Sequence, residues 1–154
     1  MALVKVAQKA GVAVFGDTVA DVQSKIFDYD ADIAPLFGGI AVVEISAVYL
    51  TYLAGGVGGT RQLVVDLLDS GSVVVLRTPI VQNVIISENR AFSLTQRGDD
   101  LSTVTIGSTV YSSEILPTGL FLCSGMKIRV GAVAGSDATD DMTVYLYLKA
   151  MYGI

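Results

Sequence analysis

The sequence predicts an all-β fold, an antiparallel β-sandwich of the jelly-roll type that forms a single domain over residues 1–154. Short runs rich in Val, Ile and Tyr recur along the chain, and Gly, Asp, Ser and Asn separate them, as is typical of strands joined by turns. The pattern supplies roughly eight to ten strands at short spacing, with no interleaved helices. A length of 154 residues matches one domain with one hydrophobic core.

The first half of the chain contains one long predicted strand and one predicted hairpin. Residues 40–53 are rich in Val, Ile and Tyr, and a Gly-rich loop at 55–59 ends this strand. Residues 63–68 and 73–77 form the hairpin, because the Asp-Ser-Gly-Ser segment between them favours a tight turn.

The second half continues in the same way. Residues 84–87 and 91–95 flank a short polar segment, and residues 103–106 follow a turn, so three further strands are predicted. Residues 126–133 and 142–151 form a final hairpin. Its second strand alternates between two faces, with Thr143, Tyr145 and Tyr147 on one and Val144, Leu146 and Leu148 on the other.

One segment departs from the strand pattern. Residues 18–27 carry apolar side chains at mixed spacing, and Asp17 before them is a suitable N-cap. We therefore expect a short helix or loop insertion near residues 17–28.

The composition argues against several classes of function. With 10 basic and 15 acidic residues and a net charge of −5, the chain is expected to repel a phosphate backbone, so no nucleic-acid partner is predicted. The chain has no His, the commonest general base and metal ligand, and no Ser, Asp or Glu pair suggests an activated nucleophile. We predict that the protein is not an enzyme and has no catalytic residue, no cofactor and no metal.

Charged residues make up 16% of the chain, against about 25% in typical soluble proteins. A protein with so little charge is expected to cover part of its surface with other chains. The longest charge-free stretch, residues 45–60, is too short for a membrane-spanning helix, and residues 10–15 lack the features of a signal peptide. Cys123 lies in an apolar run, which predicts a buried, inert thiol.

Two motifs invite a ligand-binding interpretation that their surroundings do not support. The Gly-rich segment 55–59 lacks the Gly-Lys-Ser/Thr ending of a phosphate loop and leads into a strand, so it is interpreted as a flexible strand connection. Asp28, Asp30 and Asp32 have the spacing of the first ligands of a calcium loop. However, Ile33 stands where that loop needs Gly, and Gly39 stands where it needs Glu.

Two polar loops have ordinary interpretations. The Arg-Gly-Asp triplet at 97–99 matches the integrin tripeptide, but it lies in a predicted turn and is interpreted as one. Asp137, Asp140 and Asp141 share one loop and are interpreted as a solvated acidic tip, with a cation or a basic partner as the alternative.

Two apolar segments are the best candidates for an interface with other chains. The segment from Phe27 to Phe37 carries several large apolar side chains among aspartates, which suggests an exposed segment kept soluble by charge. The N-terminal region is the second candidate. The predicted interface residues are Val12, Val14, Phe15, Phe27, Tyr29, Ile33, Leu36 and Phe37.

The C-terminal third resembles the closing strands of tailed-bacteriophage virion proteins. The resemblance covers about 40 residues, comprising Ile115-Leu116-Pro117-Thr118-Gly119-Leu120-Phe121-Leu122, Met126-Lys127-Ile128-Arg129-Val130 and the strand from Asp140 to Leu148. Such proteins include jelly-roll capsid cement, or decoration, proteins, which sit as trimers on the capsid and bridge coat subunits. The resemblance implies a non-enzymatic virion structural protein that forms a homotrimer, binds the major capsid protein or another virion protein, and is located in the virion.

Two alternatives stay open. The chain could be a tail, baseplate or fibre component of a phage particle, with the loops at 55–60 and 137–141 contacting a neighbour or a glycan. It could also be a small-molecule or carbohydrate-binding β-barrel lined by Tyr49, Tyr52, Tyr145 and Tyr147.

Overall fold

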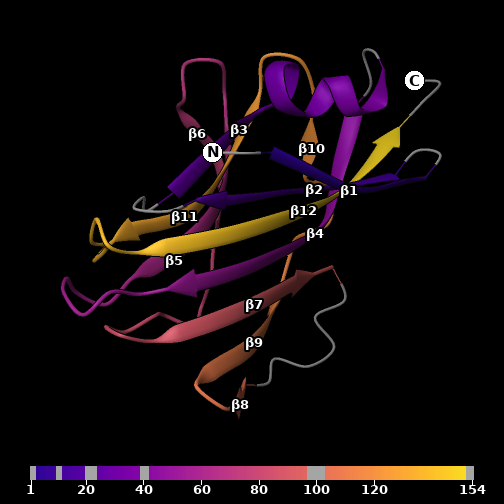
Figure 1. Cartoon of the computed structure of the whole chain (residues 1–154). Coiled ribbons are helices and arrows are strands. Elements are labelled where there is room, and N and C mark those ends of the chain that lie inside the picture. The colour runs from indigo at the N-terminus through magenta and orange to yellow at the C-terminus, as the bar shows by residue number, and fades with distance from the viewer. Residues whose placement is uncertain (1–2, 10–11, 20–23, 39–41, 97–102, 152–154) are drawn as a thin grey trace.

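The computed structural model shows two β-sheets packed face to face, which confirms the predicted all-β sandwich (Figure 1). It describes residues 3–9, 12–19, 24–38, 42–96 and 103–151, and in the first two segments it describes the backbone alone. The strands are β1 (Leu3–Lys9), β2 (Val12–Val19), β3 (Ser24–Asp28), β4 (Val42–Leu53), β5 (Gln62–Leu68), β6 (Val74–Pro79), β7 (Asn89–Thr95), β8 (Thr103–Ile106), β9 (Thr109–Ile115), β10 (Phe121–Leu122), β11 (Lys127–Ala134) and β12 (Asp141–Met151).

The strand order is that of a jelly roll. Strands β2-β12-β4-β7 form the centre of a large, eight-stranded sheet, and β3-β11-β5-β6 form a small, four-stranded sheet. All neighbours within these two sets of four are antiparallel. The chain crosses from sheet to sheet between most successive strands, which closes the sandwich around one core.

Four further strands extend the large sheet. β1 pairs with β2, the short β10 pairs with β4, and β9 and β8 continue the sheet beyond β7. The β7–β9 pair is parallel and so departs from the antiparallel prediction. The cause is that β8, which precedes β9 in the chain, is outermost, and a tight turn at Gly107 (φ 62°) brings the chain back between β8 and β7.

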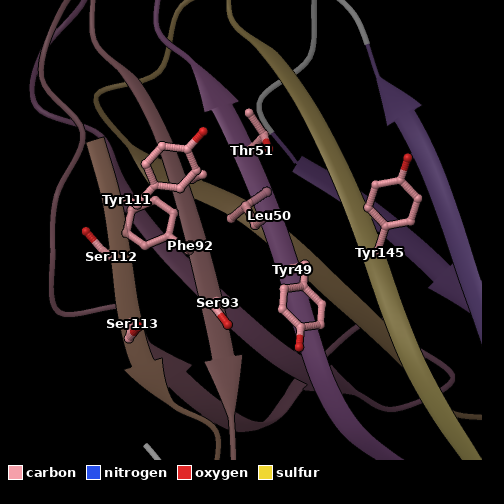
Figure 2. A pocket seen from close by; sticks show the side chains of 10 residues that line it. Tyr49, Leu50, Thr51, Phe92, Ser93, Tyr111, Ser112, Ser113 and Tyr145 are labelled. Carbon is pink, nitrogen blue, oxygen red and sulfur yellow. The ribbon is translucent and has the colours of Figure 1, made fainter. Parts of the chain in front are cut away.

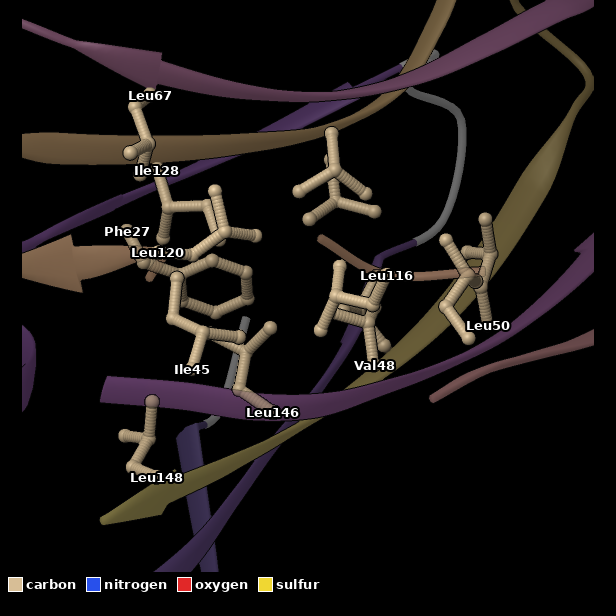
Figure 3. Packing of buried hydrophobic residues seen from close by; sticks show 14 of the residues in the cluster. Phe27, Ile45, Val48, Leu50, Leu67, Leu116, Leu120, Ile128, Leu146 and Leu148 are labelled. Atoms are coloured by element: carbon tan, nitrogen blue, oxygen red, sulfur yellow. The ribbon is translucent and has the colours of Figure 1, made fainter. Parts of the chain in front are cut away.

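The core forms where the alternating strands meet. In β12 the side chains of Val144, Leu146 and Leu148 are buried while Tyr145 and Tyr147 are exposed, as the sequence predicts. Figure 3 shows side chains from the two sheets meeting in the space between them. They include Ile45, Val48 and Leu146 from the large sheet and Phe27, Leu67 and Ile128 from the small sheet.

Two local predictions are wrong. The region 17–28, predicted to be a helix or loop insertion, contains the end of β2 and all of β3, which pairs with β11. The helical turns follow it, as a π-helical turn η1 (Tyr29–Ile33) and a 3-10 turn η2 (Ala34–Phe37). Asp28 is the N-cap, and its carboxylate accepts hydrogen bonds from the backbone N–H of Asp30 and Ala31. Pairing with neighbouring strands therefore determines the conformation of the ends of this region, and the local helix signal does not.

The predicted strand at 84–87 is also absent. Only Val84 pairs, in an isolated bridge to Arg61, and Ile85 and Ile86 are exposed. Within the described residues, no helix is both long enough and apolar enough to cross a bilayer.

Candidate functional site

The best-connected polar cluster in the described structure is buried and holds two loops together. The Arg61 guanidinium donates to both carboxylate oxygens of Asp140, at 3.0 and 2.9 Å, and Tyr52 donates to the same carboxylate at 2.6 Å. Asp140 also accepts from the backbone N–H groups of Gly55 and Asp137. Because Tyr52, Arg61 and Asp140 are fully buried, this cluster stabilises the fold and is not open to a substrate.

The same arginine determines the shape of the Gly-rich loop. Its remaining N–H groups donate to the carbonyl oxygens of Gly55, Val57 and Gly59, so a single side chain binds three backbone groups of the loop. The segment joins β4 to β5, as predicted, but it is held in place by hydrogen bonds and not loosely connected. Two of its N–H groups bind protein oxygens: Gly55 donates to Asp140 at 2.8 Å and Gly59 donates to Gly135 at 2.9 Å.

These contacts shift the acid–base properties of the cluster. Burial alone would raise the pKa of Asp140, but the hydrogen bonds from Arg61, Tyr52 and the backbone outweigh it and hold that pKa well below its usual range. Burial raises the pKa of the Tyr52 hydroxyl, and the bond to Asp140 raises it further. Both groups therefore keep one protonation state across the neutral range, which suits a structural role.

A second carboxylate is buried on the outer face of the small sheet. Asp66 binds Arg77 through two hydrogen bonds of 2.8 and 2.9 Å, and Arg129 approaches the same carboxylate at 2.6 Å. Burial raises the pKa of Asp66, but the two arginines lower it by more, so the net shift is downward. Adjacent strands β11, β5 and β6 supply the three side chains, and the two arginines together hold the single buried carboxylate at the centre of this face.

The aspartates with calcium-loop spacing have protein partners. Asp28 caps η1, Asp32 accepts from the backbone N–H of Asp28 at 2.8 Å, and Asp30 binds Ser124 and Gly125 at 2.8 Å each. The backbone bond from Gly125 and the side-chain bond from Ser124 lower the pKa of Asp30. Across the described part of the chain, no three His, Cys, Asp or Glu side chains converge as metal ligands.

The predicted interface between Phe27 and Phe37 needs correction. The side chains of Phe27, Tyr29, Ile33 and Phe37 are buried in the core of this chain, and Leu36 packs against that core. The reason is that β3 and the helical turns cover one end of the sandwich, so the apolar side chains point inward and the aspartates outward. Val12, Val14 and Phe15 lie in β2, where their side chains fall outside the described residues.

Three further expectations have different outcomes. Cys123, predicted to be buried, is exposed in the turn after β10, with its sulfur 3.5 Å from that of Met126. The Arg-Gly-Asp triplet at 97–99 lies outside the described residues. In the acidic loop, Asp140 belongs to the buried cluster, so only its neighbours can form a solvated tip.

One exposed apolar surface lies on the small sheet. Strand β6 is at the end of that sheet, and four consecutive aliphatic residues at its start are exposed: Val73 (62%), Val74 (38%), Val75 (62%) and Leu76 (44%). We call these four residues the β6 patch. The turn that precedes them is at the upper left of Figure 1, beside β6.

A second surface is a groove on the outer face of the large sheet, with a volume of about 390 Å³ (Figure 2). Its lining comes from β4, β7, β9 and β12 and includes three tyrosines, Tyr49, Tyr111 and Tyr145. Of the four tyrosines expected to line a barrel, Tyr49 and Tyr145 meet here, and Tyr147 packs edge-on against Tyr49 at 5.1 Å. Tyr52 instead points into the core. Sequence reasoning missed Tyr111, because only the parallel β7–β9 pairing brings it to this face.

Comparison with known proteins identifies no family. No protein-family model matches the chain, and no curated protein matches it. Several solved structures align over most of the chain at low similarity. They include an agarase (TM-score 0.30, 12% identity, 95% of this chain and 20% of that one) and an exo-beta-agarase (TM-score 0.32, 12% identity, 93% and 18%). Another is a structure of infectious bursal disease virus, Gx strain (TM-score 0.25, 11% identity, 98% and 35%). The chain thus spans about a fifth of the agarases, and the TM-scores are too low to support an argument about function.

Proposed function

We propose that this chain is a non-enzymatic virion structural protein of the capsid cement type, which associates with its own copies and with coat subunits through apolar contacts. The observation that carries the proposal is the β6 patch. The resemblance of the C-terminal strands to phage virion proteins and the jelly-roll strand order support it.

An exposed edge strand is normally protected from other chains. Charged side chains, proline or a bulge usually protect such an edge, because its unpaired N–H and C=O groups can pair with another strand. Here β6 has a register shift opposite Leu67 and Leu68, but its first residues are all aliphatic. Two charges flank the patch, and both have partners: Asp69 accepts from the backbone N–H groups of Gly71 and Val73 at 2.9 Å, and Arg77 is bound to Asp66. The start of β6 is therefore suited to burial against another chain.

The size of the patch indicates its place within an interface. A stable protein interface buries roughly 800 Å² on each partner, more than four side chains provide. The β6 patch is therefore the apolar centre of a larger contact, where residues contribute most to affinity. The scarcity of charge in the whole chain fits this arrangement, since 16% charged residues leave large neutral surfaces.

Light scattering over a dilution series tests self-association. We expect a trimer, and we expect the double variant Val73→Asp/Val75→Asp to shift it to monomer, because a charged strand edge cannot be buried without a partner charge. Val57→Asp is the matched control: Val57 is 66% exposed and lies in the loop before β5, at the end opposite the β6 patch. A wild-type monomer at every concentration would overturn the proposal.

Location on the particle tests the virion role separately. Purified virus particles from the source of the gene are analysed by mass spectrometry and by antibody labelling in electron microscopy. Labelling over the head supports the cement role. Labelling over the tail contradicts that role in favour of a tail or fibre component, and absence from the particles contradicts both.

A further inference from the structure

We propose that the groove on the outer face of the large sheet binds neutral carbohydrate, with tyrosine rings stacking on sugar rings and serine and threonine hydroxyls bonding sugar hydroxyls. This site is separate from the β6 patch, which belongs to the small sheet. The inference therefore does not depend on the self-association proposed above.

The register of four strands builds the groove. Tyr145 of β12 is opposite Tyr49 of β4, Tyr49 is opposite Ser93 of β7, and Ser93 is opposite Ser113 of β9. Side chains directly opposite one another point to the same face of a sheet. One row across the outer face thus runs from two tyrosines to two serines.

In the next row the small side chains come first and the tyrosine lies at the β9 end. Thr51 is opposite Ala91, and Ala91 is opposite Tyr111. Small side chains at the centre form the floor, while Tyr49 and Tyr111 form opposite walls, as Figure 2 shows. Their strands are separated by β7 alone, and since neighbouring strands lie about 4.8 Å apart, the walls are roughly 10 Å apart.

The size of the groove suits a small ligand or a short stretch of a polymer. Its volume of about 390 Å³ lies within the ~300–1,000 Å³ of typical ligand clefts. The edge-on contact with Tyr147 restrains the ring of Tyr49 from outside the groove. A restrained ring loses little conformational entropy on binding, which favours affinity.

The chemistry of the lining points to a neutral, hydroxylated ligand. Tyr49, Tyr111 and Tyr145 are 37%, 46% and 38% exposed, so their rings offer apolar surface and their hydroxyls hydrogen bonds. Thr51, Ser93 and Ser113 add further hydroxyl groups. A sugar ring has the complementary combination, with an apolar face of C–H groups and a rim of hydroxyls.

The absence of charged residues from the lining of the groove further restricts the class of ligand. The ten residues that line it include no Lys, Arg, Asp or Glu. With a net charge of −5 on the chain, nothing in this lining attracts a phosphate or sulfate polymer. A purely apolar ligand would leave the hydroxyls of the floor without partners, which costs free energy.

Binding to an array of neutral and acidic glycans tests the proposal, followed by titration of a retained neutral oligosaccharide. Tyrosine fluorescence reports the titration, because the chain has seven Tyr and no Trp. We expect Tyr49→Ala and Tyr111→Ala each to weaken binding roughly three- to ten-fold, since each removes one stacking ring. Phe121→Ala is the matched control: Phe121 is 40% exposed, but it lies on β10, outside the lining, and should leave binding unchanged.

A second variant tests the groove without removing a tyrosine. Ser93→Tyr fills the floor at an outward-facing strand position where an aromatic residue suits a sheet. We expect it to abolish binding while circular dichroism and thermal unfolding stay close to wild type. Retention of no neutral glycan, retention of acidic glycans alone, or equal binding by all variants would each overturn the proposal.

Discussion

The guanidinium of Arg61 donates two hydrogen bonds to the carboxylate of Asp140, which lies 79 residues further along the chain, and neither side chain is exposed. The pair joins the loop before β5 to the loop before β12. Each of these loops connects the two sheets, so the ion pair fixes how the sheets are joined at one end of the sandwich.

Arg61→Ala should lower the free energy of unfolding by roughly 3–5 kcal/mol, because it leaves the buried carboxylate of Asp140 without its cation. Urea unfolding followed by circular dichroism measures the loss. The control is Arg77→Ala: Arg77 is 44% exposed in its side chain, and Arg129 stays bound to Asp66, so a loss of roughly 1 kcal/mol or less is expected. Equal losses in the two variants would contradict a dominant role for the buried pair.

Acid should unfold the protein through Asp66 and Asp140. Both have a folded-state pKa below the value of about 3.9 expected in the unfolded chain, so the unfolded state binds protons more readily. Their stabilising contribution is complete well above pH 4 and declines as pH falls from about 4 through the lower folded values. Urea unfolding at pH 7, 4 and 3 measures this decline. The free energy of unfolding should fall less steeply with pH in Asp140→Asn than in the wild type, compared at the same pH values. If this pH dependence were unchanged in Asp140→Asn, groups other than Asp140 would be responsible for the acid sensitivity.

Gly135→Ala should be far more destabilising than Gly107→Ala. Both glycines have positive φ, 77° and 62°, so alanine at either position costs about 1–2 kcal/mol. A Cβ at Gly107 has open space, whereas a Cβ at Gly135 would overlap the backbone carbonyl of Thr60. We therefore expect a loss of about 3 kcal/mol or more for Gly135→Ala. Thermal and urea unfolding of the two variants compare these losses of stability. Similar values would show that the loops that contain Gly135 and Thr60 can move apart at little cost in free energy.

Cys123 should react with a maleimide in the native protein. The thiol is exposed in the turn after β10, so labelling should be complete without denaturant and should be absent in Cys123→Ser. Mass spectrometry of the intact chain gives the extent of labelling. If labelling required urea, another chain or segment would have to cover the turn.

The sequence predicts the sandwich well because strand alternation is a local property. Residues 142–151 alternate between core and solvent as their pattern predicts, and the hairpin around 69–72 forms where its turn residues stand. The helical turns begin after Asp28 and not after Asp17, because Asp17 lies within β2 and pairs with β12, whereas Asp28 ends β3 and its carboxylate caps η1.

The candidate sites depend on contacts between distant segments, which a single sequence does not reveal. Arg61 looks like an ordinary residue at the start of a strand until the fold places Asp140 beside it. Likewise, Tyr111 reaches the groove through a parallel pairing that the turn signals alone would not suggest. The alternation of side chains along β4 and β12 could predict only that Tyr49 and Tyr145 lie on the outer face of the sheet, where they line the groove.

The position of β12 determines when the fold can be completed during synthesis. It pairs with β2 on one side and β4 on the other, so it occupies the middle of the large sheet although every other described strand precedes it in the chain. Until residue 151 has emerged, the edges of β2 and β4 that pair with β12 have no strand between them, and the nascent chain exposes apolar surface. Folding must then follow translation of this strand, and a chaperone that shields the waiting strands should raise the yield of native protein.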